Sequence, residues 1–121
     1  MRWRLLLGLV AAAALSCGDK IDAVQESAGA CPGAVTYELD IRPILESLCV
    51  GCHDSTLSGA ARNGAPVSAD FDSFAGALRK TDPPWTTRLR NETMPPGGTK
   101  ASAAQKQLVQ CWVEGGKQEK P

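Results

Sequence analysis

Hydrophobic positions along the chain fall into one continuous N-terminal run and three later stretches with helical spacing. Residues 5–15 are Leu, Gly, Val and Ala only. Farther along, apolar residues recur every three or four positions over 37–48, over 71–79 and from Ser102 onward, which is the spacing of one face of an α-helix. No β-branched stretch alternates with polar residues, so we predict an all-α fold.

The first two predicted helices carry capping signals. Asp40 is the expected N-cap of the helix over 37–48, and Pro43 then falls in the first turn, where its missing N–H breaks no helical hydrogen bond. Asp70 or Asp72 is the expected N-cap of the second helix.

The last predicted helix has the clearest boundaries. Ser102-Ala103-Ala104-Gln105 is a capping box, and Gly115-Gly116 is a stop signal. Residues 54–69, rich in small and polar side chains, and residues 93–99, which contain two prolines, are predicted loops. The inner face of the helix is expected to hold Leu108, Cys111 and Trp112.

The N-terminal run is typical of an export signal. Arg2 and Arg4 precede it, and its 11 residues are too few to span a bilayer. Ala14-Leu15-Ser16-Cys17 resembles the lipobox of bacterial lipoproteins, which predicts a signal peptide over 1–16 and a lipidated Cys17 that anchors the chain to a membrane. Ordinary secretion with cleavage near Cys17 is the alternative. Because Gly18 and not Asp follows the cysteine, the outer membrane is weakly favoured.

Composition predicts a flexible tether and argues against one class of partner. Residues 17–34 show no periodicity and are mostly polar or small, so we expect a flexible tether before a single domain over 35–118. The chain has 13 basic and 13 acidic side chains, and a balanced charge argues against nucleic acid as a partner. Loss of Arg2 and Arg4 with the signal peptide leaves 11 basic side chains against 13 acidic ones.

Cys49-Val50-Gly51-Cys52-His53 is the signature for covalent attachment of a c-type haem. Two thiols three residues apart lie on one side of a helical turn, and each can add to a vinyl group of the porphyrin. His53 follows directly and can place its imidazole under the ring as an iron ligand. The alternatives are a redox disulfide, which would want a βαβ context, and half of a zinc site completed by Cys31 or Cys111.

The motif and the order of elements make the chain similar to small class I-like cytochromes c, especially bacterial lipoprotein forms whose N-terminal helix reads Ile-Arg-Pro-Ile-Leu (41–45). The resemblance covers roughly residues 36–116. It implies three or so helices around one covalent haem c, with a methionine in a Pro-rich loop as the sixth iron ligand. Met94-Pro95-Pro96-Gly97 matches that loop. Met94 is also the only Met, and His53 the only His, left after removal of residues 1–16.

The other residues predicted for the site would line the haem or donate hydrogen bonds to its propionates. A buried porphyrin would account for the low aromatic content of 5%, and its two propionates need hydrogen-bond donors. The expected donors are Lys80, Trp85, Arg88 and Arg90. The expected lining residues are Leu45, Leu48, Phe71, Phe74, Leu78, Leu89, Leu108 and Trp112.

The chain has five cysteines, and Cys31 and Cys111 have no part in the haem motif or the lipobox. Export places them where disulfides persist, so we expect a bond between them. Two unrelated thiols are the alternative.

The sequence therefore predicts a monomeric, membrane-tethered electron carrier that exchanges single electrons with redox proteins on the periplasmic side, and no enzymatic reaction. Two alternatives stay open. In a haem enzyme or sensor, Met94 would dissociate to open the sixth position for peroxide or a gas. A haem-bearing docking module would instead stay fixed to a larger complex.

Overall fold

The computed structural model describes residues 29–121. The predicted signal peptide, the lipid site at Cys17 and the tether as far as residue 28 lie outside the described residues. Within 29–121 the chain is helical and contains no strand, as expected for an all-α fold. The elements are the π-helix η1 (Tyr37–Ile41), α1 (Arg42–Leu48), the 3₁₀ helix η2 (Gly59–Arg62), α2 (Phe74–Leu78), α3 (Trp85–Arg90) and α4 (Ala103–Glu114).

The helical segment over 37–48 is confirmed, but its predicted cap is wrong. Thr36 is the N-cap: its hydroxyl accepts a hydrogen bond from the backbone N–H of Leu39. Asp40 lies inside η1, and its carboxylate reaches back to the Thr36 N–H at 2.8 Å. Pro43 falls in the first turn of α1. The wide π-turn of η1 thus ends at Arg42, whose N–H donates to the Tyr37 carbonyl, one residue before Pro43, which has no N–H to donate.

The later helices agree in part with the expectation. In α4 the capping box of Ser102 and Gln105 is present, and Gly115 is the C-cap. The cap of α2 is Ser73, which accepts from the Gly76 N–H at 3.0 Å, and neither Asp70 nor Asp72 serves. Helix α3 was not expected from the sequence.

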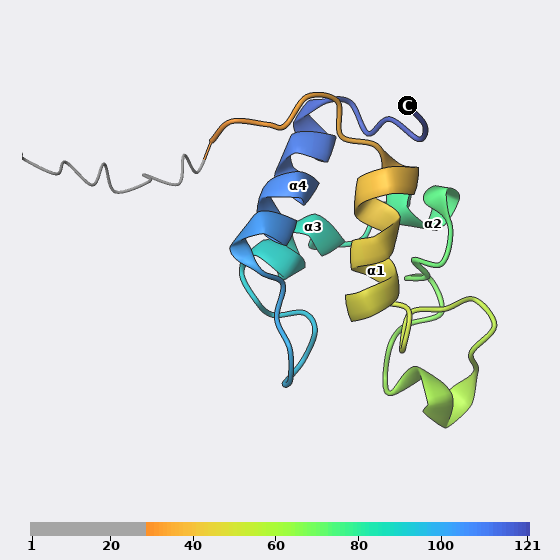
Figure 1. Cartoon of the computed structure of the whole chain (residues 1–121). Helices are drawn as coiled ribbons and strands as arrows, with labels where there is room; N and C mark the ends of the chain where they lie inside the picture. Colours follow the sequence, from red (N-terminus) through yellow and green to blue (C-terminus); the bar gives the residue numbers. More distant parts are fainter. Residues whose placement is uncertain (1–28) are drawn as a thin grey trace, which may run out of the picture.

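The hydrophobic core lies between η1–α1, α3 and α4 (Figure 1). Its largest fully buried side chains are Trp112, Ile41, Leu45 and Leu89. On the inner face of α4, Val109 is buried with Cys111 and Trp112, whereas Leu108 is only partly buried. The carbonyl of Gln118 accepts from both the Tyr37 N–H and the Trp112 indole N–H, so the C-terminal residues close over this core.

A covalent link also joins two segments at the end of the molecule where the C-terminal residues lie. The sulfurs of Cys31 and Cys111 form a disulfide bond. Residues 29–34 are exposed, and the bond fixes them to the C-terminal half of α4 (Figure 1). Over residues 29–121, none of the helices has the length and apolar character needed to cross a membrane.

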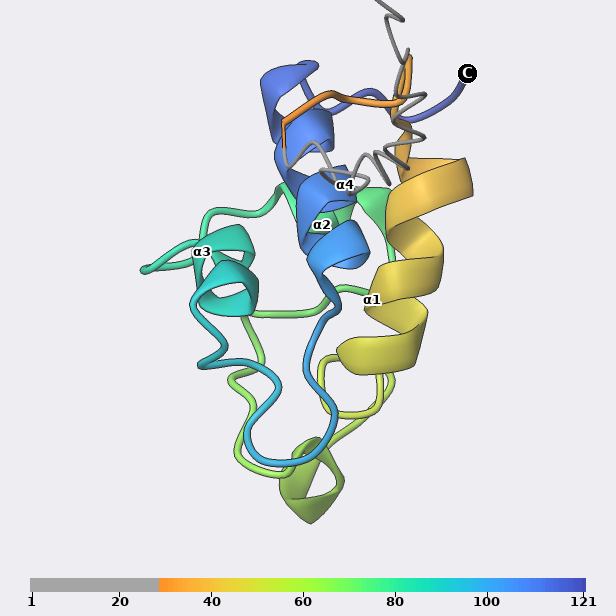
Figure 2. The same cartoon turned by 60° about the vertical axis from the view of Figure 1, so that its left-hand side comes forward.

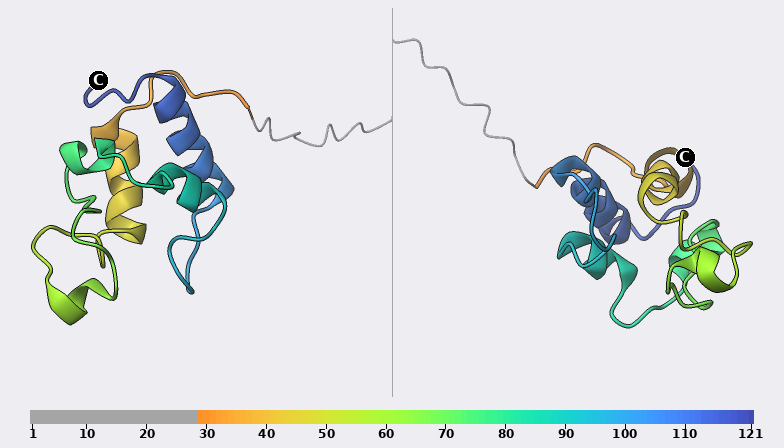
Figure 3. Two further views of the ribbon diagram at one scale, coloured as in Figure 1. Left: turned by 180° about the vertical axis from the view of Figure 1, so that it is seen from behind. Right: turned by 90° about the horizontal axis from the view of Figure 1, so that it is seen from below.

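Two long loops leave the opposite end of the helices. One follows α1 and includes η2, and the other joins α3 to α4 (Figure 2). Seen from below, the two loops lie on either side of the space between the helices, and the C-terminus lies at the far end (Figure 3). This arrangement creates the cavity described next.

Candidate haem site

A cavity of about 420 Å³ opens between the two loops, and it is lined mostly by apolar side chains. Its size falls in the range of ordinary ligand and cofactor pockets. The lining includes all four residues that the sequence singled out for the haem: Cys49, Cys52, His53 and Met94. The structure therefore brings together residues that are up to 45 positions apart in the sequence.

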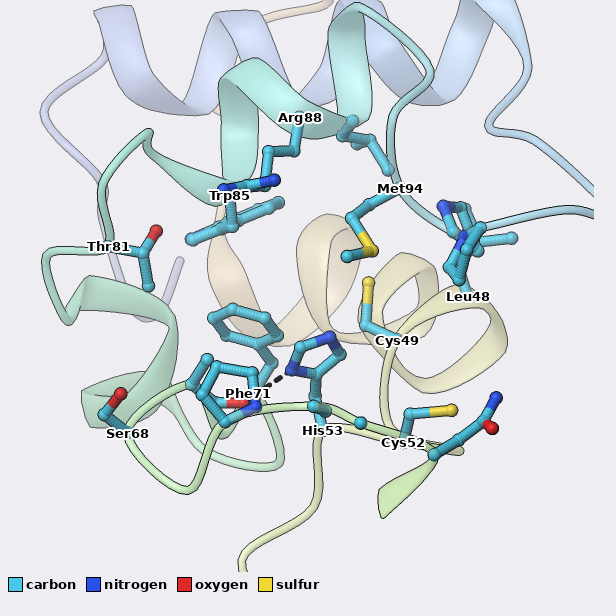
Figure 4. Close-up of a pocket in the computed structure, with 18 of the residues that line it drawn as sticks. Leu48, Cys49, Cys52, His53, Ser68, Phe71, Thr81, Trp85, Arg88 and Met94 are labelled. Atoms are coloured by element: carbon cyan, nitrogen blue, oxygen red, sulfur yellow. Dashed lines mark hydrogen bonds between the residues drawn. The ribbon is translucent and has the colours of Figure 1, made fainter.

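The two thiols enter the cavity from the end of α1. The backbone N–H of Cys49 bonds the Leu45 carbonyl at 2.8 Å, and those of Cys52 and His53 bond the Cys49 carbonyl at 3.1 and 2.9 Å. This tight turn places the two cysteines and the histidine along one wall (Figure 4). Neither thiol is in a disulfide.

Burial raises the pKa of the Cys49 thiol to about 11. Redox-active cysteines instead have a lowered pKa, because the thiolate is the attacking species. The absence of any strand in residues 29–121 also removes the βαβ context of a thioredoxin-like site. Cys31 and Cys111, the candidates to complete a zinc site, are bonded to each other.

The orientation of the His53 ring is fixed by two contacts. Its Nδ1 lies 2.7 Å from the carbonyl oxygen of Ala69, and since a carbonyl can only accept, Nδ1 must carry the proton. The lone pair of Nε2 is then left for a metal. The Phe71 ring packs on the imidazole with centroids 4.9 Å apart, and the Phe71 N–H donates to the His53 carbonyl at 2.8 Å.

Met94 enters the cavity from the other loop. Its backbone N–H donates to the Arg88 carbonyl at the end of α3, at 3.2 Å. The next residue is held as well, because the Lys100 ammonium bonds the Pro95 carbonyl. In Figure 4 the Met94 thioether and the His53 imidazole point into the same cavity from two sides.

The rest of the lining differs from the expected set. Leu48, Phe71 and Leu89 line the cavity. Leu45 and Trp112 are buried in the core, and Leu78 is 39% exposed. The expected lining residues that do not line the cavity are Leu45, Phe74, Leu78, Leu108 and Trp112.

Of the four expected donors, Lys80, Arg88 and Trp85 line the cavity and Arg90 does not. Trp85 contributes its indole face, because its N–H already donates to the Ala77 carbonyl at 2.8 Å. The lining thus holds two cationic side chains, Lys80 and Arg88, and one carboxylate, that of Asp82. This excess of positive charge suits a ligand with anionic groups.

The sequence reasoning missed Arg62 and Ala69. Ala69 was invisible because its contribution is a backbone carbonyl. Arg62 is 4% exposed, which no feature of the surrounding loop sequence indicates. Comparison of the chain with protein-family models, curated proteins and solved structures finds no match, so the interpretation of the site rests on its residues.

These residues fit a covalently bound haem. The two thiols, an imidazole with Nε2 available and a thioether line one mostly apolar cavity, together with the cationic side chains of Lys80 and Arg88. Cys49 and Cys52 would hold the porphyrin, and His53 and Met94 would bind its iron. The haem would supply the one-electron redox chemistry.

Proposed function

We propose that this protein is a single-haem c-type cytochrome that carries electrons between redox proteins. The supporting observation is the arrangement around one cavity of Cys49, Cys52, His53 and Met94, which come from two loops, one after α1 and the other between α3 and α4. A thioether and an imidazole together saturate the iron and raise its reduction potential relative to two imidazoles. The fold is then a small cytochrome c-like one, with haem as part of its core.

The chain's own residues have separate roles in this proposal. The Ala69 carbonyl fixes the His53 tautomer and ring plane. The Arg88 and Pro95 backbone contacts hold the loop that presents Met94. Phe71, Trp85 and Leu89 are buried in the lining and would keep water away from a bound haem. If His53 and Met94 both bind the iron, it would have no position open for a substrate, and redox partners would meet the protein through a small interface.

The location of the carrier is part of the same proposal. Export by residues 1–16 and lipidation of Cys17 would tether the haem domain to the periplasmic face of a membrane, with the outer membrane weakly favoured. The chain would act as a monomer. Mass spectrometry of the mature protein would report the haem, the lipid and the disulfide in one measurement.

A substitution at Met94 tests the ligand set. Met94→Ala should keep the covalent haem, lower the reduction potential, and remove the far-red band that marks methionine bound to ferric haem. His53→Ala should abolish stable haem incorporation. An unchanged optical spectrum in Met94→Ala would refute Met94 as a ligand. A high-spin wild-type spectrum with ready CO or cyanide binding would favour the haem enzyme or sensor.

A further inference from the structure

Arg62, on η2 in the loop after α1, is a buried charged side chain outside the cavity lining. It is 4% exposed. A guanidinium has five N–H donors, and five acceptors surround this one within 3.3 Å. They are the carbonyls of Asp54, Leu57, Ala65 and Pro66 and the carboxylate of Asp70.

These acceptors belong to two segments that meet at His53. The Arg62 guanidinium donates to the carbonyl of Asp54, the residue after His53, at 2.8 Å. It also donates to the carboxylate of Asp70, the residue after Ala69, at 2.6 Å. Ala69 is the residue whose carbonyl accepts the His53 Nδ1–H. Arg62 therefore joins the backbone that carries the imidazole to the backbone that orients it.

Apolar packing contributes little to holding the loop between Arg62 and Ala69 in place. Between Arg62 and Ala69, Val67 is 78% exposed, and Gly64, Pro66 and Ser68 are exposed. The loop thus has few buried side chains to define its course, and the guanidinium bonds are its main internal support. A buried ion pair is costly to desolvate and is strongly destabilising when one partner is removed.

We propose that the Arg62–Asp70 pair is a positioning unit for the His53 imidazole, an inference that rests on the proposed role of His53 as an iron ligand. By holding Ala69 in place, the pair keeps the Nδ1–H···O=C bond short. A strong hydrogen bond at Nδ1 makes the imidazole a better electron donor through Nε2. Loss of the pair loosens that bond and raises the reduction potential of the iron.

The test compares three variants of the haem-loaded full chain with the wild type. Arg62→Gln removes the charge and most donors, Arg62→Lys keeps the charge, and Asp70→Asn keeps an acceptor without the charge. The matched control is Arg42→Gln, which removes an exposed arginine whose ion pair with Glu46 is also exposed. The readouts are the solvent-exchange rate of the His53 Nδ1 proton by NMR and the reduction potential.

In Arg62→Gln we expect proton exchange to quicken about tenfold, the change given by losing one hydrogen bond, and the potential to rise. Arg62→Lys and Asp70→Asn should show smaller changes in the same direction, and Arg42→Gln none. Wild-type exchange and potential in a folded Arg62→Gln would overturn the proposal. If that variant does not fold, wild-type values in folded Asp70→Asn overturn it equally.

The two proposals fail in distinguishable ways. A wild-type chain that carries no covalent haem refutes the electron carrier. In that case the exchange rate of the His53 Nδ1 proton in the haem-free chain, with and without Arg62→Gln, still decides whether Arg62 positions the imidazole. A haem-loaded wild type whose Arg62 and Asp70 variants leave both readouts unchanged refutes only the positioning role.

Discussion

The end of the molecule that holds Cys31 and the C-terminus and the end that holds the cavity are built from different interactions. At the first end, Trp112, Ile41 and Leu45 are fully buried. The Cys31–Cys111 disulfide and the Gln118 carbonyl add links between segments far apart in the sequence. This end is a conventional apolar core, closed by covalent and backbone bonds.

At the cavity end, the chain runs in two long loops, and polar contacts support each of them. Arg62 supports one loop, and the Lys100 bond to Pro95 supports the other. Between them lies the cavity of about 420 Å³. The first end is closed by its own apolar core, whereas the second contains a cavity between two loops.

The largest effect on this comparison should come from removing the disulfide. The bond closes a loop with a sequence separation of 80, and chain entropy then gives about 4–5 kcal/mol of stabilisation. Cys31→Ala/Cys111→Ala should lower the free energy of unfolding by an amount of that order, as measured by urea titration. A haem optical spectrum that stays unchanged below the transition would locate the damage away from the cavity. A loss smaller than about 1 kcal/mol would contradict the entropic account.

Hydrogen exchange tests directly whether the cavity end is less stable than the end that holds the apolar core. Chain with covalent haem should show backbone protection about tenfold or more above haem-free chain in residues 54–70 and 91–100, because local opening of those loops exposes the cavity. Amides of α4 and of the segment over 37–48 should be protected in both forms. Protection lost across the whole haem-free chain would show that the core does not fold unaided.

Removing the cap of α4 should have a smaller effect. Ser102→Ala deletes a side chain that accepts from the Gln105 N–H at 3.1 Å, which costs about 1 kcal/mol in typical helices. Ser58→Ala is the matched control, because Ser58 is the N-cap of η2 but its side chain makes no capping hydrogen bond. Equal losses of unfolding free energy in the two variants would contradict this assignment.

The smallest expected effect is at alkaline pH. Burial raises the pKa of the Tyr37 phenol, an effect that nearby Arg42 partly offsets. A raised folded-state pKa means that its stabilising contribution is complete below the unfolded value of about 10 and is lost as pH rises through the folded value. Urea unfolding at about pH 8 and 11 should therefore show a smaller loss in Tyr37→Phe than in wild type. Identical losses would show that Tyr37 does not titrate differently on folding.

The elements with strong local signals could be predicted from the sequence. The capping box at Ser102 and the two glycines after Glu114 define α4 almost to the residue. The N-caps of the other helices were harder to predict, because several side chains within a few positions could each cap the helix. The structure uses Thr36 and not Asp40 as the N-cap of η1, and Ser73 and not Asp70 or Asp72 as the N-cap of α2.

The rest depends on tertiary contacts that leave no periodic pattern. Helix α3 has six residues, fewer than two turns, and its buried positions are Trp85 and Leu89 alone. The candidate site could be predicted where chemistry is carried by side chains in motifs, as at Cys49, Cys52 and His53. Arg62 could not, since arginine is almost never buried unless its donors are satisfied, and its acceptors are mainly backbone carbonyls.

The two cysteines of the disulfide lie 80 positions apart in the sequence, and this separation affects the order in which disulfides can form during biosynthesis. Cysteines 31, 49, 52 and 111 can form any of six single disulfides, and only the Cys31–Cys111 bond leaves both thiols of the Cys-x-x-Cys motif free. During synthesis Cys31 meets Cys49 and Cys52 before Cys111 exists, and shorter loops close more readily. The high pKa of Cys49 in the folded chain, about 11, slows exchange only once the fold has formed. Under the proposed function, the order of thiol oxidation and haem attachment would decide whether Cys49 and Cys52 are both free to bind the porphyrin.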